Sequence, residues 1–370
     1  MTLRVLLIGA GGVFGSRIVR ELAGDPRFQL ILAGRHEARL TALRDMLGDS
    51  SVQTATLDVA APDLVATMAH LRPQLVIHAA GPFQTQDYRV AEACLACGSD
   101  YADLADGRDF VSGIGRLDGR AKAAGRLLVS GASTVPAFSS AVVDALLPRF
   151  SALEKIEHAI SPGNRAPRGD ATVAAILGYC GRALPLWRDD RWKIGHGWMS
   201  SRRQAFAFGP RWVGLCDVPD LELFPLRYAG VRTVEFRAGL ELKRLHFATL
   251  AAACLVRLGL VCDLGRHAPR LRRLSERFLS SGSDVGGMVV ELVCRDTHGR
   301  PLRLCWALSA AAGDGPQIPA TPAVVLARKL ADGDLSACGA RPCMGLFTLD
   351  EALAALAGFA ITTRLDVVTA

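Results

Sequence analysis

The stretch from Arg4 to Leu22 reads RVLLIGAGGVFGSRIVREL, and it decides the fold. Val5 to Ile8 form an apolar run that is typical of a buried parallel strand. A glycine-rich turn follows directly, and apolar residues then recur at helical spacing as far as Leu22. Strand, tight turn and helix in this order begin a βαβ unit that can hold the pyrophosphate of a dinucleotide.

Each glycine of the turn has a physical reason to be there. Gly9 lets the chain leave the strand sharply, Gly11 or Gly12 lets the backbone approach the phosphates, and Gly15 lets the helix pack closely. The spacing fails as GxGxxG, because Phe14 stands in the last glycine's place, but it completes as GxxGxxG. The alternative is an ordinary glycine-rich strand–helix turn of an α/β protein. We expect cofactor contacts from the whole turn, which comprises Gly9, Ala10, Gly11, Gly12, Val13, Phe14 and Gly15.

Length and composition limit the possible classes of protein. The chain has 370 residues, which predicts two domains, and 50% of the residues are hydrophobic, which allows a substantial core. The formal net charge is +7, but the basic residues are scattered apart from the stretch Arg266–Arg277. No basic module interleaved with aromatic residues is present, so we do not expect nucleic-acid binding.

Cysteine usage and the N-terminus point to the cytoplasm. Ten cysteines in a chain of this length suggest reduced thiols rather than a disulfide framework. Cys94 and Cys97 form a CxxC inside a helical pattern, and Cys338 and Cys343 lack further His or Cys partners nearby. We therefore interpret these cysteines as packing residues and expect no metal site. No secretory signal is visible.

The most apolar later stretch, Phe247 to Leu264, is interrupted by Arg257 and Asp263. It is shorter than a membrane-spanning helix requires. We do not expect membrane or lipid contact here, although the sequence leaves open whether this stretch meets lipid or only a partner subunit.

Short strands alternate with helices through the first part of the chain. After the first strand, strands are expected at Phe28–Ala33, Val52–Leu57, Leu75–Ala80, Tyr101–Leu104 and Leu127–Ser130, with helices between them. This alternation predicts an α/β fold with a Rossmann-type, doubly wound parallel sheet and right-handed crossovers.

The strand ends favour NADP as the cofactor. No acidic residue ends the second strand; Arg35 stands there, and its guanidinium fits the fork of a 2′-phosphate. The alternative is a solvated arginine that caps the next helix. Asp58, after the third strand, either meets the adenine or caps a helix. The small residues Ala79, Ala80 and Gly81 leave space for the cofactor after the fourth strand.

The pattern changes after Ser130. Strands with alternating polarity are expected at Ile156–Ile160, Thr233–Ala238, Met288–Cys294 and Leu302–Leu308, with helices at residues 170–180 and 247–258. The stretch Leu184–Pro225 supports only a loop-and-strand interpretation. We expect a nucleotide-binding domain over residues 1–150, completed by C-terminal helices in 320–370, and an α+β substrate or dimerisation domain over 151–319.

Several longer motifs run through the chain. They are GAGGVFG at 9–15, AAGPF at 79–83, QDYRVAEAC at 86–94, YADLADGRDF at 101–110, SGASTVPAFSSAVVD at 130–144 and GARPCMGLFTLDE at 339–351. With these motifs the chain resembles the saccharopine dehydrogenase-like (saccharopine reductase-like) oxidoreductases. The resemblance covers nearly the whole chain and is densest in the first 150 residues.

The resemblance implies a Rossmann-type NADP domain and an inserted α+β domain that often mediates dimerisation, hence a homodimer. It implies that Ala79 to Phe83 line the nicotinamide side, and that the loops after Asp103 and Ser130 face the substrate. It also implies a small-molecule substrate, either an amino acid or an imine formed from one.

Three residues are candidates for handling protons and substrate polarity. No tyrosine has a lysine four residues later, so short-chain dehydrogenase chemistry is not expected. Tyr88, Asp106 and Ser133 follow three successive strands and are the predicted catalytic residues. Their alternatives are a packing ring for Tyr88, a turn cap for Asp106 and a helix cap for Ser133. We interpret His78 and Asp103 as structural.

The leading hypothesis is an NADP-dependent oxidoreductase that transfers a hydride to or from a small C=N or C=O group, in an amino-acid-derived imine or keto acid. One alternative is a reductase of a lipid-linked enoyl substrate. Another is a non-catalytic NADP(H)-binding sensor or scaffold, which the lack of an obvious acid/base pair leaves open.

Overall fold

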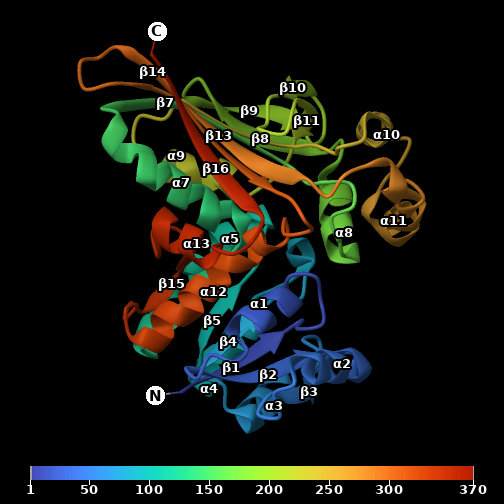
Figure 1. Cartoon of the computed structure of the whole chain (residues 1–370), viewed down its shortest axis with the longest axis vertical. Helices are drawn as coiled ribbons and strands as arrows, with labels where there is room; N and C mark the ends of the chain where they lie inside the picture. Colours follow the sequence, from blue (N-terminus) through green and yellow to red (C-terminus); the bar gives the residue numbers. More distant parts are fainter. Residues whose placement is uncertain (1, 370) are drawn as a thin grey trace. The chain divides into compact units, whose positions relative to one another are not determined.

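The computed structural model describes residues 2–369, and the chain divides into two compact units (Figure 1). The first unit comprises Met1–Ala141 and Pro316–Leu356, and the second comprises Val142–Gly315 and Ala357–Ala370. The chain therefore leaves the first unit earlier than the expected boundary at residue 150. Its last residues also differ from the expected helices, because Ile361–Thr369 is a strand of the second unit.

The first unit is built on a seven-stranded parallel sheet. Four residues of the first strand and all four of the fourth are buried, as expected of strands covered on both faces. The strands are β1 (Leu3–Ile8), β2 (Phe28–Gly34), β3 (Gln53–Thr56), β4 (Leu75–His78), β5 (Asp100–Asp103), β6 (Leu127–Ser130) and β15 (Gly339–Pro342).

The helices of this unit follow the strands in alternation. They are α1 (Gly15–Leu22), α2 (Glu37–Leu47), α3 (Leu64–Leu71), α4 (Arg89–Cys97), α5 (Arg108–Ser112), α6 (Asp118–Ala123), α12 (Gln317–Asp332) and α13 (Leu349–Ala355), while α7 (Ser139–Leu146) spans the boundary between the units. The strand order is β15-β6-β5-β4-β1-β2-β3. The Rossmann-type, doubly wound fold predicted from the sequence is confirmed, and its strand order reverses direction between β1 and β4.

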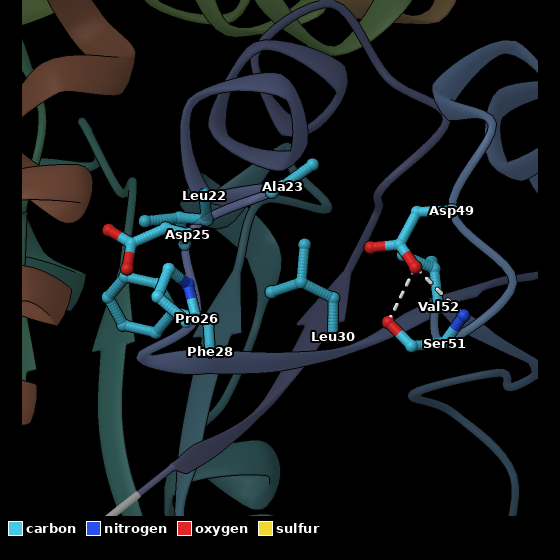
Figure 2. A pocket seen from close by; sticks show the side chains of 10 residues that line it. Leu22, Ala23, Asp25, Pro26, Phe28, Leu30, Asp49, Ser51 and Val52 are labelled. Carbon is cyan, nitrogen blue, oxygen red and sulfur yellow. Dashed lines mark hydrogen bonds between the residues drawn. The ribbon is translucent and has the colours of Figure 1, made fainter.

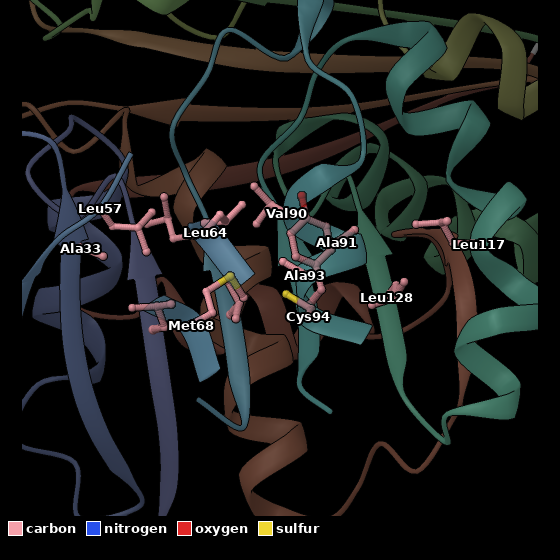
Figure 3. Close-up of a cluster of buried hydrophobic side chains, with 14 of the residues drawn as sticks. Ala33, Leu57, Leu64, Met68, Val90, Ala91, Ala93, Cys94, Leu117 and Leu128 are labelled. Atoms are coloured by element: carbon pink, nitrogen blue, oxygen red, sulfur yellow. The ribbon is translucent and has the colours of Figure 1, made fainter. Parts of the chain in front are cut away.

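Apolar side chains fill the space between this sheet and one layer of helices. Figure 3 shows Met68, Val90 and Cys94 from α3 and α4 beside Ala33 and Leu128 from the strands. Each of these side chains is at most 2% exposed, and burying a side chain of valine or methionine size stabilises a fold by about 1.5–3 kcal/mol. Cys94 is thus a packing residue, and its burial raises the pKa of its thiol well above the ordinary value.

The chain returns to the first sheet after the second unit. The amide of Ala340 donates to the Asp118 carboxylate at 3.0 Å, and Cys343 donates from its backbone to the Ser130 carbonyl at 2.7 Å. Helix α13 starts at a capping box, in which Thr348 and Glu351 bond each other's backbone amides. Helix α12 begins at Gln317, just before the expected C-terminal region at 320–370, and Pro322 lies inside it.

The second unit contains a mixed nine-stranded sheet with the main order β10-β11-β12-β7-β13-β14-β16. Its strands are β7 (Ala152–Ser161), β8 (Ala183–Arg188), β9 (Arg191–His196), β10 (Arg202–Gln204), β11 (Arg211–Leu215), β12 (Thr233–Ala238), β13 (Gly286–Arg295), β14 (Pro301–Ala310) and β16 (Ile361–Thr369). Its helices are α8 (Asp170–Tyr179), α9 (Asp220–Arg227), α10 (Lys243–Arg257) and α11 (Ala268–Glu276). The expected α+β class is confirmed.

Within residues 2–369, no helix is both long enough and apolar enough to span a bilayer. The same part of the chain holds no group of three or more His, Cys, Asp or Glu side chains arranged for a metal ion.

Candidate nucleotide-binding and active site

The turn after β1 presents unpaired backbone donors. The N–H groups of Gly11, Val13, Phe14 and Gly15 donate to no acceptor within the described chain, and the backbone at Gly11 is exposed. Helix α1 begins at Gly15, the last of these residues, so its positive end adds to the cradle. Four free donors at a helix start, with Gly11 exposed and Gly15 buried, fit the pyrophosphate of a dinucleotide.

The amides of the other turn residues are already bonded within the protein, and these residues give the turn its shape. The amides of Gly9 and Ala10 both bond the Ala33 carbonyl, at 2.8 and 3.2 Å, and Ala10 is fully buried. The Gly12 amide bonds the Gly9 carbonyl at 2.9 Å and closes the turn. A Cβ on Gly15 would overlap that same carbonyl oxygen, so this glycine lets the helix start against the turn.

The turn touches the end of β4, where the strand order reverses. Gly9 has a φ of +84°, and a Cβ there would lie 2.9 Å from the backbone carbon of Ala79. The Ala79 amide in turn donates to the Ile8 carbonyl at 2.8 Å. The glycine turn and the small residues after β4 therefore border one place at the carboxyl edge of the sheet, where open α/β sheets bind their ligands.

Arginines flank the turn beyond β2. Arg35 is exposed between β2 and α2, and it forms no ion pair within residues 2–369. Helix α2 starts at Glu37 without a side-chain cap bond, so the capping alternative for Arg35 is not seen. Arg39 was missed by the sequence analysis, although its Cβ lies 3.4 Å from where a Cβ on Gly11 would stand. Arg39 lies four residues after Arg35, and this spacing could have indicated from the sequence that the two arginines lie close together.

Asp58, after β3, caps a turn. Its carboxylate accepts from the Ala60 amide at 3.0 Å, and its carbonyl accepts from the Ala61 amide at 3.1 Å. Asp58 does not cap the following helix, whose N-cap is Asp63, and a contact with adenine stays a prediction.

Gln86 fixes the loop after β4, and the sequence analysis also missed it. Its side-chain amide donates to the carbonyls of Ala80 and Pro82, at 2.7 and 3.1 Å. A glutamine six residues after a strand has no distinctive spacing, so only the folded loop shows this role. The bonds hold Ala79, Ala80 and Gly81 in place beside the turn.

Asp106 lies on the loop after β5 and is held by the loop after β4. The Gln84 side-chain amide donates to its carboxylate at 3.0 Å. A Cβ on Gly107 would lie 3.3 Å from the Gln84 backbone nitrogen, so the two loops pack closely. Burial raises the pKa of the Asp106 carboxyl above its ordinary value.

Tyr88 is half-buried and already has a hydrogen-bond partner. Its hydroxyl donates to the Phe110 carbonyl at 2.6 Å, and its ring packs on the Phe110 ring with centroids 4.8 Å apart. Burial raises the pKa of this hydroxyl. These contacts favour the packing alternative, and a catalytic role for Tyr88 stays a prediction that would require this bond to break.

Ser133 follows β6 and is 7% exposed. Its hydroxyl makes no hydrogen bond within the described chain and does not cap the following turn, Thr134–Phe138. The helix-cap alternative is therefore not seen. No hydrogen bond joins Ser133 to Tyr88 or Asp106 in residues 2–369, although the three follow adjacent strands of the sheet.

A buried polar cluster underlies these loops. The Asp103 carboxylate accepts from the amides of Ala105 and Gly131, at 2.9 and 2.8 Å, and from the Ser130 hydroxyl at 3.0 Å. It thereby ties the end of β5 to the end of β6. The His78 ring of β4 meets the Tyr101 hydroxyl at 3.2 Å, and both side chains are 1% exposed.

A small pocket lies elsewhere on the first unit. Figure 2 shows it between the end of α1 and the starts of β2 and β3, lined by residues such as Ala23, Leu30 and Val52. Its volume is about 140 Å³, and its Asp25 is paired with Arg27 at 2.7 Å. The pocket lies at the amino ends of the strands, opposite the glycine turn, and has no part in the site.

The fold and the turn define a dinucleotide-binding protein of the Rossmann class. Residues 5–129 match the family model described as the saccharopine dehydrogenase NADP binding domain. This part of the chain is therefore similar to an NADP-binding domain of the saccharopine dehydrogenase type, and it lies within the first unit.

Two curated proteins are similar to part of the chain. A putative trans-acting enoyl reductase of Mycobacterium tuberculosis is 39% identical over 106 residues, which are 27% of this chain and 24% of that protein. The carboxyaminopropylagmatine dehydrogenase of Synechocystis is 34% identical over 105 residues, 28% of this chain and 26% of that protein. The chain thus matches about a quarter of the length of these relatives.

Two solved structures share the fold over almost the whole chain. Apo saccharopine dehydrogenase (L-Glu forming) from Saccharomyces cerevisiae has a TM-score of 0.68 at 13% identity, covering 98% of this chain and 100% of that one. An amine dehydrogenase from Mycobacterium smegmatis has a TM-score of 0.50 at 13% identity, covering 95% and 96%. At these identities the likeness is one of fold.

The first prediction concerns the exposed part of the turn. Gly12→Val should abolish measurable NADP(H) binding, because the added methyl groups occupy the approach to the free amides. Thermal unfolding without ligand should stay close to the wild type. Gly119→Val, in open space on α6, is the matched control and should bind normally. Equal binding by both variants would show that the cofactor does not use this turn.

His78 and Asp103 of the buried cluster should change the folding stability with pH in opposite directions. Burial lowers the pKa of His78 from 6.5 to about 4, so stability is lost as pH falls from 6.5 toward 4 and the unfolded histidine takes up a proton. Burial raises the pKa of Asp103 from 3.8 to about 6, so the folded state binds its proton first. Its contribution to stability therefore rises as pH falls from about 6 toward 4.

The second prediction separates these two effects. We compare the unfolding free energy of Asp103→Asn with that of the wild type at each pH. The difference should favour the variant more at pH 7 than at pH 4, by roughly 3 kcal/mol. His78→Gln should show the opposite sign of similar size. The measurement is the unfolding free energy from denaturant titrations across this range, with exposed Asp334→Asn as the control. A pH-independent difference for both variants would contradict the assignment.

Proposed function

We propose that the protein is an NADP-dependent oxidoreductase that acts on a small C=N or C=O group, in an amino-acid-derived imine or keto acid. The observation that carries the proposal is the set of four free amides at the start of α1, beside the small residues that follow β4. When bound, NADP(H) would supply or accept the hydride.

Named residues would hold the parts of the cofactor. The amides of Gly11, Val13, Phe14 and Gly15 would bind the pyrophosphate. Arg35, assisted by Arg39, would bind the 2′-phosphate, because both are exposed on the side of the turn that faces α2. Ala79, Ala80 and Gly81 would leave room for the nicotinamide, and Asp58 would lie toward the adenine.

Asp106 and Ser133 are the residues proposed to meet the substrate. The Ser133 hydroxyl has no partner in residues 2–369 and is available to a polar substrate group. The raised pKa of Asp106 lets it hold a proton at a higher pH than an ordinary aspartate, which suits a group that donates to an imine or carbonyl. Tyr88 would act with them only after releasing the Phe110 carbonyl.

A lipid-linked enoyl substrate is the second candidate. The similarity to a putative trans-acting enoyl reductase supports it, but this match covers 27% of the chain. A non-catalytic NADP(H)-binding protein is the third candidate. A substrate panel separates all three.

We also propose a cytoplasmic homodimer. None of the ten cysteines forms a disulfide in the structure, which suits a reducing compartment. The dimer is what the resemblance implies, and sedimentation of the purified protein tests it.

The third prediction concerns cofactor choice. Arg35→Ala should weaken NADP(H) binding by on the order of 1–3 kcal/mol while leaving NAD(H) nearly unchanged, because only the former carries the phosphate. Binding is measured by fluorescence titration. Arg44→Ala, on helix α2 just after Arg35 and paired with Asp45, is the control. An equal loss for both cofactors would remove Arg35 from the phosphate site.

The fourth prediction concerns turnover. The wild type should consume NADPH with at least one member of a panel of imines, keto acids and enoyl thioesters. Asp106→Asn and Ser133→Ala should each lower that rate at least roughly tenfold with NADPH binding unchanged. Exposed Asp109→Asn is the control, and Tyr88→Phe shows whether that hydroxyl takes part.

NADPH consumption with the enoyl thioesters and with no other member of the panel would favour the second candidate, a reductase of a lipid-linked enoyl substrate. Tight NADPH binding without NADPH consumption across the panel would contradict the proposed activity. It would favour the third candidate, a non-catalytic NADP(H)-binding protein. Full activity of both variants would move the substrate site away from Asp106 and Ser133.

A further inference from the structure

One segment of the second unit carries most of the protein's net charge. Residues 243–282 contain α10, α11 and their connection, and we name them the basic–apolar surface. The segment has eight basic and two acidic residues, so it accounts for +6 of the formal net charge of +7. Figure 1 shows α10 and α11 near each other in this unit.

The outward face of α10 is apolar. Phe247, Ala248, Ala251, Leu255 and Leu258 are exposed and recur at intervals of one, three or four residues, which places them on one face of the helix. The side chains of His246 and Ala253 are fully buried on the other face. The outward face of this surface helix is thus apolar along this stripe, where a polar face is usual.

The stripe is strongly exposed, and the apolar surface continues beyond it. Leu258 and Leu260 are 71% and 70% exposed, and Leu274 and Leu279 of the α11 region are also exposed. Six of the fourteen large apolar side chains that are exposed in the described chain lie in this segment of forty residues. The apolar stretch seen in the sequence is therefore a surface feature and not a buried helix.

Unpaired cations surround the stripe. Lys243, Arg257, Arg270, Arg273 and Arg277 are exposed and form no ion pair within residues 2–369. Their neighbour Arg272 behaves differently, since it is paired with Asp170 and Glu276. Five positive charges are thus left for something outside the described chain.

The two helices form one surface. The Arg244 guanidinium, near the start of α10, lies 4.3 Å from the centroid of the Phe278 ring, just after α11. Phe247 also packs on Trp212 of β11, with ring centroids 5.2 Å apart, which anchors α10 on the sheet. The leucines and the free arginines therefore belong to connected elements with a fixed base.

We propose that the basic–apolar surface docks on an anionic lipid bilayer. The exposed leucines would enter the boundary between headgroups and acyl chains, and the free cations would meet lipid phosphates. Helix α10 would lie in the plane of the membrane, since no helix in residues 2–369 can span one. Charge argues against a second copy as the occupant, because two such surfaces would bring ten unpaired cations together.

Vesicle flotation tests this proposal without reference to enzyme activity. The wild type should float with vesicles of phosphatidylcholine and phosphatidylglycerol, float much less with phosphatidylcholine alone, and detach at high salt. The double variant Leu255→Asp, Leu258→Asp should lose flotation. Leu226→Asp is the control, because this leucine is 80% exposed on α9, outside the surface.

A second experiment removes positive charge from the basic–apolar surface. The double variant Arg270→Gln, Arg273→Gln should lower the partition coefficient roughly 25-fold, since each basic residue near a charged membrane contributes roughly fivefold. Arg149→Gln, an exposed arginine outside the surface, should partition normally. NADPH binding and thermal unfolding of each variant show that it is folded.

Three outcomes would overturn the proposal. The first is a wild type that does not float with anionic vesicles. The second is flotation that persists in both double variants. The third is a wild-type dimer in sedimentation that Leu255→Asp dissociates while vesicles do not bind, because the surface would then belong to a second copy.

Discussion

The structure depends on the close contact between the glycine turn and the end of β4. Gly9 adopts a positive φ, and any side chain there would meet the backbone of Ala79. Because the contact lies where the strand order reverses, it brings the free amides of the turn beside the small residues that follow β4. A cofactor whose pyrophosphate lies on the turn then has its nicotinamide directed toward the ends of β4, β5 and β6.

Buried polar side chains support that edge of the sheet. Asp103 ties the ends of β5 and β6 together, and the neutral His78 meets Tyr101 one strand away. The loops that carry Asp106 and Ser133 leave the sheet from this base. The cluster resembles an active site in its composition, yet its burial and the bonds of Asp103 to the Ala105 and Gly131 amides make it a support for the exposed loops that follow.

Local patterns predicted much of the first unit, and tertiary contacts account for what they missed. The strands and the glycine turn follow from continuous apolar runs and from backbone geometry. Gln86 acts through hydrogen bonds that only the folded loop creates. Helix α9 was missed because Pro225 lies inside it, and β16 because its pairing with β14 is distant in sequence. The apolar stripe of α10 could not be placed inward or outward from periodicity alone, since apolar residues occur on both its faces.

The central claim is that the turn and Arg35 make an NADP(H) site. The most direct test is a titration of the purified wild-type protein with NADPH and NADH, followed by fluorescence and by thermal stability. Tight NADPH binding that raises the melting temperature, with weak NADH binding, is the predicted result. No binding of either cofactor, with the protein folded, would contradict the account and leave the glycine turn as a packing feature.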